Sequence, residues 1–292
     1  MKYSALIGNP TEHSVSPLLF EWIASRLPDP IEYKHLKVDI PDASQLGSAL
    51  EAFHKVGFCG VNVTLPYKMD VIPLLDKVDE SIANIGAVNT ITFGEDGSAG
   101  YNTDWFGIYK PLNDVSKDTH KKQAIIFGTG GAARAAIYAC LELKVQSIIV
   151  LHRSIESDRA KLLMSQFKNQ ESIHFDIYEN INHYINEAGI VINATSAGMV
   201  GQDPTPFSLD ILDVDKSMSD KIFFDCVFNP VKTQLATHFK TKDMLIIDGL
   251  WMMIYQGLLA FTLWTGSDVN DMFKKNELEE LHTLLQERIE HA

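Results

Sequence analysis

The chain has 292 residues, 46% of them hydrophobic and 22% charged, which is enough for two domains that each bury a core. Its formal net charge of −13 argues against binding to nucleic acid or to an anionic membrane surface, because both are negatively charged. Three cysteines (Cys59, Cys140 and Cys226) show neither a zinc-binding spacing nor a disulfide framework, which is typical of a cytoplasmic protein.

Strands and helices alternate along the first hundred residues. A period of two in the apolar residues predicts strands at 3–8, 31–40, 60–66, 86–94 and 97–104. Helices are expected after Pro17 and over 43–57, where Gly57 supplies the C-terminal stop. This alternation favours an α/β layer architecture.

A second α/β pattern begins near Lys121, and a domain boundary is expected at 113–122. The segment "QAIIFGTGGAARAAIYACLELKVQSIIVLHRS" indicates strand, glycine turn, helix and strand, and further strands are expected at 189–196, 221–228 and 244–249. Each strand ends in small or polar residues, which face the ligand crevice of an open parallel sheet. The apolar stretch 250–264 is too short to span a bilayer and predicts a buried helix.

Gly128, Gly130 and Gly131 form a glycine turn between a strand and a helix, followed by the small residue Ala132. Glycines allow close approach of a pyrophosphate to the backbone, and the N-terminus of a helix favours negative charge. Within a βαβ unit this spacing predicts a dinucleotide site, although a plain tight turn is the alternative.

The second strand of this unit ends in His152, Arg153 and Ser154. Enzymes that use NAD usually place a carboxylate there, to accept hydrogen bonds from the ribose hydroxyls. The forked cation of Arg153 suits a 2′-phosphate instead, so NADP is favoured over NAD, and the alternative is a solvated surface arginine.

The strand "GVNVTLPYK" alternates apolar residues with Asn62 and Thr64 and then presents Lys68. Elsewhere the chain offers neutral hydrogen-bonding side chains and one carboxylate that suit a small polyol better than a phosphate. These are Ser14, Ser16, Asn89, Asp104 and Gln256. Taken singly, each has a structural alternative: a helix cap or turn for the serines, Asn89 and Asp104, and a core amide for Gln256.

Seven segments, in this order, make the chain resemble the shikimate dehydrogenase family: "HSVSP", "GVNVTLPYK", "GAVNT", "NTD", "GTGGA", "NATSAGM" and "DGLWMMIYQ". The resemblance implies an α/β fold of two domains with a cleft between them. Residues 1–106, completed by 250–292, would bind substrate, and residues 107–249 would form a Rossmann-type NADP-binding domain. The implied reaction is the reversible NADP-dependent reduction of 3-dehydroshikimate to shikimate in chorismate and aromatic amino acid biosynthesis.

The resemblance also implies roles for individual residues. Lys68 is the catalytic lysine and Asp104 its carboxylate partner, and no metal is expected. The implied substrate-binding residues are Ser14, Ser16, Thr64, Asn89, Asp104 and Gln256, and the implied cofactor-binding residues are Gly128, Thr129, Gly130, Gly131, Ala132, His152, Arg153, Ser154 and Gly249. A helix starting after Pro66 would favour neutral Lys68, whereas Asp104 would favour its charged form, so base and charged hydrogen-bond donor both stay open.

Two departures from the family pattern leave the substrate open. Phe228 stands where a tyrosine is usual, and Trp251 replaces a glycine. The alternatives are a quinate/shikimate dehydrogenase, a paralogue acting on a related cyclic hydroxy acid, and a nucleotide-binding module without turnover, against which the lysine and aspartate argue. The expected partners are small molecules (shikimate, 3-dehydroshikimate or quinate) without nucleic acid or membrane, and the expected state is a monomer or homodimer.

Overall fold

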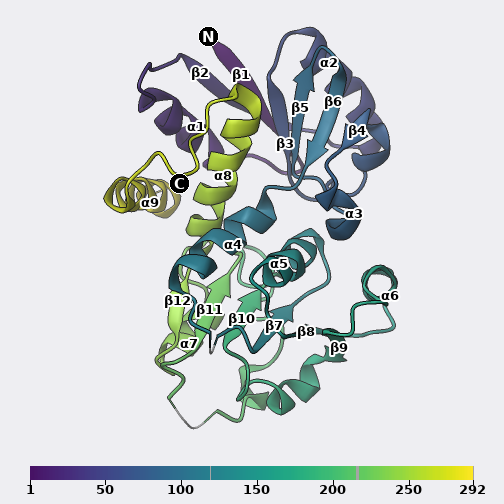
Figure 1. The fold of residues 1–292 in the computed structure, drawn as a ribbon, viewed down its shortest axis with the longest axis vertical. Coiled ribbons are helices and arrows are strands. Elements are labelled where there is room, and N and C mark those ends of the chain that lie inside the picture. Colours follow the sequence, from purple (N-terminus) through teal and green to yellow (C-terminus); the bar gives the residue numbers. More distant parts are fainter. Residues whose placement is uncertain (119, 215–216, 292) are drawn as a thin grey trace. The chain divides into compact units, whose positions relative to one another are not determined.

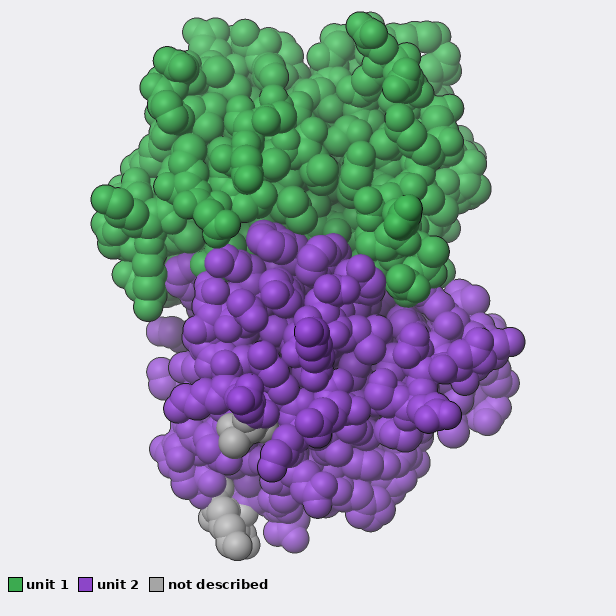
Figure 2. All heavy atoms as spheres, in the orientation of Figure 1, with its two compact units in different colours: residues 1–104, 254–292 green, residues 105–253 purple. Residues whose placement is uncertain are grey.

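The computed structural model describes residues 1–118, 120–214 and 217–291, and so leaves out residue 119 of the expected boundary segment. The chain divides into two compact units (Figure 2). Unit 1 comprises Met1–Asp104 and Ile254–Ala292, and unit 2 comprises Trp105–Met253. Among the described residues, no helix is both long and apolar enough to cross a bilayer.

Unit 1 is built on a mixed six-stranded sheet in the order β2-β1-β3-β5-β6-β4 (Figure 1). Its strands are β1 (Lys2–Gly8), β2 (Tyr33–Asp39), β3 (Gly60–Val63), β4 (Lys77–Val78), β5 (Thr90–Gly94) and β6 (Gly97–Tyr101). Strand β1 pairs in parallel with β2 and β3, whereas β5 is antiparallel to β3 and β6. The five strands predicted in this part of the chain are therefore confirmed. The short strand β4 was not predicted.

The helices of unit 1 include the two that were expected, after Pro17 and over 43–57. They are α1 (Ser16–Ser25), η1 (Ala43–Gln45), α2 (Leu46–Lys55), η2 (Ile72–Leu74), α3 (Ser81–Ile85) and α9 (Lys275–Glu290), together with the C-terminal part of α8 (Gly249–Thr265). Gly57, with φ of +83°, follows α2 in the left-handed conformation that favours glycine at a helix end. Helix α8 packs closely on the sheet, and the absence of a side chain at Gly60 allows this, since a Cβ atom there would clash with the Trp264 ring. The Nε1 atom of Trp264 donates to the carbonyl of Ile91 at 2.9 Å.

Unit 2 contains a six-stranded parallel sheet in the order β12-β11-β10-β7-β8-β9. Its strands are β7 (Gln123–Phe127), β8 (Ser147–His152), β9 (Ile173–Ile177), β10 (Ile190–Asn193), β11 (Ile222–Asp225) and β12 (Leu245–Ile247). Its helices are α4 (Asp104–Val115), α5 (Gly131–Glu142), α6 (Asp158–Gln166), η3 (Tyr178–His183), η4 (Leu209–Ile211), α7 (Gln234–Lys240) and the first turn of α8. This strand order is that of a Rossmann-type sheet, whose ligands bind where the order reverses, here between β7 and β10.

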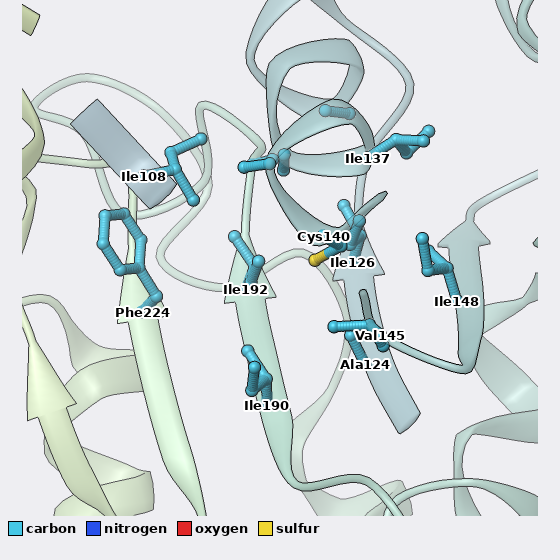
Figure 3. Packing of buried hydrophobic residues seen from close by; sticks show 14 of the residues in the cluster. Ile108, Ala124, Ile126, Ile137, Cys140, Val145, Ile148, Ile190, Ile192 and Phe224 are labelled. Carbon is cyan, nitrogen blue, oxygen red and sulfur yellow. The ribbon is translucent and has the colours of Figure 1, made fainter. Parts of the chain in front are cut away.

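One core cluster of unit 2 lies between the parallel strands and α5 (Figure 3). Ile126, Ile148, Ile192 and Phe224, from four strands, are completely buried. Helix α5 approaches them closely because its sequence is rich in alanine, and its buried Cys140 contributes to the same cluster. This packing fixes the N-terminus of α5 at the carboxyl end of β7, where a phosphate site is expected.

Candidate active site

Lys68 and Asp104 form an ion pair within unit 1. The Nζ atom of Lys68 lies 2.5 Å from Oδ2 of Asp104, and the two side chains are only 17% and 7% exposed. Partial exclusion of water strengthens the attraction between the charges. The pair therefore combines a proton-carrying amino group with a carboxylate that holds it in place.

The segment after Pro66 does not form the helix that was expected at Lys68. The Tyr67 amide donates to the carbonyl of Thr64 at 3.1 Å, which closes a tight turn. The carbonyl of Lys68 accepts from the amide of Val88 at 2.8 Å, so it is not used in a regular helical hydrogen bond. The first helical turn, η2, begins only at Ile72. The expected effect of a helix dipole on Lys68 is therefore wrong.

Asn89 fixes the carboxylate of Asp104 from the side opposite the lysine. Its Nδ2 donates to Oδ1 of Asp104 at 2.8 Å and its Oδ1 accepts from the amide of Thr103 at 2.6 Å. Asn89 and Asp104 are 3% and 5% exposed. Each carboxylate oxygen of Asp104 thus has its own partner, which restricts its rotation.

Gln256 is connected to this network through Thr103. The hydroxyl of Thr103 donates to Oε1 of Gln256 at 3.2 Å and also lies 3.0 Å from Nδ2 of Asn89. Asn62 supports the cluster from β3 by donating to the carbonyl of Asn89 at 3.2 Å. Thr103 and Asn62 were noted in the sequence as polar residues, but neither was assigned a role in binding or catalysis. Both stand in the motifs that marked the site, so their neighbours were the available signal.

Ser14 lies in the loop that joins β1 to α1, and Ser16 is the first residue of α1. The hydroxyl of Ser14 donates to Oγ of Ser16 at 2.9 Å, and the Ser16 amide donates to Oγ of Ser14 at 3.2 Å. The cap position of α1 is Val15 and has no side-chain capping bond, so the serines are not explained as helix caps. Thr64, which follows β3, lies next to the start of this loop, where a Cβ atom at Gly8 would clash with its methyl group.

In unit 2, the glycine turn leaves open space at the N-terminus of α5. Gly128 has a φ of +106°, which favours glycine, and a Cβ atom at Gly130 would meet none of the described residues within 4 Å apart from its neighbours in the chain. Thr129 is 6% exposed, and Gly131 is the first residue of α5. The turn therefore offers backbone amide groups, in the place where a pyrophosphate would need them.

The loop after β10 borders the same turn. A Cβ atom at Gly128 would lie 3.0 Å from both the carbonyl oxygen of Ala194 and Cγ2 of Thr195. The Thr195 hydroxyl donates to Oδ1 of Asn193 at 2.7 Å, and Asn193 donates to Asp225 at 2.9 Å. Thr195 was not named as a candidate residue, although its "NATS" motif was noted.

Asp225 is completely buried and connects two loops at the carboxyl edge of the parallel sheet. Besides Asn193, it accepts from the hydroxyl of Thr233 at 2.6 Å and from the amide of Val227 at 3.0 Å. Burial, with a smaller contribution from Asp248, raises the pKa of the Asp225 carboxyl to about 6.

Gly249 packs against the segment that follows Asp225. A Cβ atom at Gly249 would clash with the carbonyl of Val227 and would lie 2.8 Å from the amide nitrogen of Phe228. The start of α8 therefore requires glycine next to the segment that carries Phe228, whose side chain is half-buried.

His152 is the last residue of β8, and Arg153 and Ser154 follow it, as expected. The ring Nδ1 of His152 lies 2.9 Å from the carbonyl oxygen of Ser154, which stabilises the turn. Arg153 is exposed and has no ion pair within the described part of the chain. An open glycine turn, a helix N-terminus and an exposed guanidinium together fit a dinucleotide with an additional phosphate. Among the residues that the structure describes, no three His, Cys, Asp or Glu side chains gather in a way that could hold a metal ion.

The doubly wound sheet with its glycine turn, together with the lysine–carboxylate pair, defines a class of two-unit α/β enzymes that use a dinucleotide. Within that class, the chain belongs to the shikimate dehydrogenase family. Residues 6–91 match the shikimate dehydrogenase substrate binding domain, 112–201 the shikimate / quinate 5-dehydrogenase family, and 249–271 the shikimate 5'-dehydrogenase C-terminal domain.

Known relatives are similar over nearly their whole length. The chain is 36% identical to the shikimate dehydrogenase (NADP(+)) of Geobacillus kaustophilus, over 93% of this chain and 96% of the relative. The crystal structure of shikimate 5-dehydrogenase from Thermus thermophilus, in complex with NADP(H) and shikimate, has a TM-score of 0.77 at 30% identity, over 91% and 94% of the two chains. Quinate dehydrogenase from Corynebacterium glutamicum, in complex with NAD, has a TM-score of 0.77 at 29% identity, over the same shares.

Proposed function

We propose that this protein is an NADP-dependent shikimate dehydrogenase, an oxidoreductase that reversibly reduces 3-dehydroshikimate to shikimate. The observation that carries the proposal is the contact of 2.5 Å between Lys68 and Asp104 in a polar, largely buried cluster. The relatives named above support the same reaction and the same cofactor. This activity belongs to chorismate and aromatic amino acid biosynthesis.

The chemistry requires a hydride and a proton. NADPH supplies the hydride when it is bound. Lys68 supplies the proton, because its ammonium donates to the oxygen of the keto group as negative charge develops there, and its amine accepts the proton in the reverse direction. Asp104 orients Lys68 through the contact of 2.5 Å and is itself held by Asn89. Both residues act most strongly in the transition state, which is where binding energy accelerates a reaction.

We assign substrate binding to the polar side chains of unit 1. Ser14 and Ser16 offer adjacent hydroxyls suited to the carboxylate of shikimate, and the remaining side chains suit its ring hydroxyls. These remaining residues are Thr64, Asn89, Asp104 and Gln256. On this assignment, residues 1–106 and 250–292 form the substrate-binding domain.

We assign cofactor binding to residues 107–249. The backbone of the glycine turn from Gly128 to Ala132 would hold the pyrophosphate, and Arg153 would pair with the 2′-phosphate. His152 and Ser154 would shape the turn that presents Arg153, and Gly249 would allow close packing at the start of α8. Arg153 supports NADP over NAD because an accessible cation stands there in place of the carboxylate that would accept from the ribose hydroxyls of NAD.

A second candidate function is the oxidation of quinate. It is favoured by Phe228, which replaces the tyrosine of the family pattern, and by the similarity to a quinate dehydrogenase. Initial rates of cofactor reduction, with NADP⁺ or NAD⁺ and with shikimate or quinate, separate the two. The proposal predicts that shikimate with NADP⁺ gives the highest kcat/KM, and a higher value for quinate with NAD⁺ would overturn it.

We also infer a cytoplasmic location and a monomer or homodimer. The buried thiol of Cys140 supports the first inference, because free cysteines are typical of a reducing compartment. Fractionation of cells tests the location, and light scattering of the purified protein distinguishes the two oligomeric states.

A further inference from the structure

The loop that carries Ser14 and leads into Ser16 is anchored to the end of β2. Asp39, the last residue of β2, accepts two hydrogen bonds in its Oδ1 atom, from the amide and from the hydroxyl of Thr11, both at 2.7 Å. The parallel register of β1 and β2 pairs Gly8 with Asp39, so the loop leaves β1 directly beside this carboxylate.

Thr11 transmits this anchor to the serines. Its carbonyl accepts from the amide of Ser14 at 3.0 Å, and the hydroxyl of Ser14 in turn donates to Ser16 at 2.9 Å. Thr11 is 4% exposed, whereas Asp39 is exposed. A short series of hydrogen bonds thus runs from a surface carboxylate, through a buried threonine, to both serine hydroxyls.

A second contact from β2 holds the next residue of the loop. Lys37 lies two positions before Asp39 and therefore on the same side of the strand. Its ammonium donates to the carbonyl of Glu12, the neighbour of Thr11. Strand β2 consequently fixes two consecutive loop residues, each through a charged side chain.

The carboxylate of Asp39 is suited to this position. Hydrogen bonds from the side chain and the backbone of Thr11, and the nearby charge of Lys37, hold its pKa below the ordinary value. Hydrogen bonds to an ionised acceptor are shorter and stronger than those between neutral groups. Within the described part of the chain, no hydrogen bond or ion pair joins Asp39 to Lys68 or Asp104, so Asp39 has no direct part in proton transfer.

We propose that Asp39 is a positioning residue for substrate binding, which fixes Thr11 and thereby sets where the hydroxyls of Ser14 and Ser16 lie. The inference rests on the proposed function, since it takes the two serines as the carboxylate site for shikimate. A residue with this role affects the affinity for shikimate. It leaves the affinity for NADP and the rate of the chemical step nearly unchanged.

The test compares three purified variants with the wild type in steady-state kinetics and in amide hydrogen exchange. Asp39→Ala removes the acceptor, and Asp39→Asn keeps an oxygen that can accept from Thr11. Asp42→Ala is the matched control, because Asp42 is also an exposed aspartate after β2 and accepts from the Ser44 amide at 2.8 Å, away from the loop. Thermal unfolding shows that each variant is folded.

For Asp39→Ala, we expect the KM for shikimate to rise about tenfold, which corresponds to about 1.4 kcal/mol, with kcat and the KM for NADP⁺ changed less than about twofold. Exchange of the Thr11 and Ser14 amides becomes faster. Asp39→Asn recovers most of the wild-type affinity, and Asp42→Ala matches the wild type in both measurements.

An unchanged KM for shikimate in Asp39→Ala would overturn the proposal. A fall in kcat together with a similar rise in the KM values for both shikimate and NADP⁺ would overturn it too. If the wild type itself does not oxidise shikimate, the proposed function fails, and the exchange data then decide on Asp39 alone. Faster exchange of Thr11 and Ser14 in Asp39→Ala would still support its positioning role, whereas unchanged exchange would refute it.

Discussion

The amino group of Lys68 and the carboxylate of Asp104 lie 2.5 Å apart, and the second oxygen of that carboxylate is bound by Asn89 at 2.8 Å. The contact joins the turn after β3 to the first residue of α4. Because both oxygens of Asp104 have partners, the carboxylate has a fixed orientation and therefore fixes the position of the Lys68 amino group. That geometry is what a proton donor needs during hydride transfer.

Asp104→Asn should lower kcat by about a hundredfold or more and should also raise the KM for shikimate. The amide keeps the size of the side chain but loses the charge that orients Lys68, so kcat falls. The KM rises because Asp104 is also assigned to substrate binding. Steady-state kinetics with shikimate and NADP⁺ measure both effects. Asp114→Asn, an exposed position on the same helix, is the matched control and should behave as the wild type. Near-normal kinetics of Asp104→Asn would remove this residue from the catalytic pair.

Arg153→Asp should reduce the preference for NADP⁺ over NAD⁺ by about ten- to a hundredfold, the range expected for loss of hydrogen bonds to a charged group. The new carboxylate repels the 2′-phosphate and can accept from the ribose hydroxyls of NAD⁺. The ratio of kcat/KM values for the two cofactors measures this preference. Arg288→Asp, at an exposed position of α9, controls for the change of net charge. A ratio unchanged in Arg153→Asp would mean that Arg153 is only a surface residue.

Asp225 should make stability depend on pH. Because its pKa is raised to about 6 from 3.8, the folded protein keeps this proton at pH values where the unfolded chain has lost it. Its stabilising effect is therefore present at low pH and is lost as the pH rises through about 6. Relative to Asp225→Asn, the wild type should gain about 1 kcal/mol in the free energy of unfolding between pH 7 and pH 5.

Urea unfolding of both proteins at the two pH values measures this difference. A difference between wild type and Asp225→Asn that is the same at pH 5 and pH 7 would show that Asp225 is ionised throughout this range. The hydrogen bonds from Thr233, Asn193 and Val227 would then stabilise the ionised carboxylate more than burial destabilises it.

Local signals in the sequence predicted most of the fold. The glycine turn after β7 and the alternating residues of β1, β3 and β7 need only near neighbours to define their structure. Strand β9 was not predicted, although Ile173, Phe175 and Ile177 alternate with polar residues. It lies at the edge of the sheet and is only partly buried, so its apolar signal is weak.

Contacts between distant residues could not be predicted in the same way. A helix after Pro66 was expected, but the carbonyl of Lys68 is bonded to Val88, which only the folded sheet brings near. The same holds for the positions of Thr103, Asn62 and Asp39, whose partners lie on other elements. Of the candidate residues, Lys68, Asn89, Asp104 and Gln256 lie in one hydrogen-bonded cluster, and the bonds that join them became visible only in the structure.

The catalytic role of Lys68 is tested most directly by the kcat of Lys68→Ala for the oxidation of shikimate with NADP⁺. We expect a loss of at least about a hundredfold in kcat with a smaller change in KM, because the side chain acts mainly in the transition state. Lys55→Ala, at an exposed lysine paired with Glu51, should retain wild-type kinetics. A Lys68→Ala protein that is folded and turns over shikimate at a rate near that of the wild type would contradict the proposed mechanism.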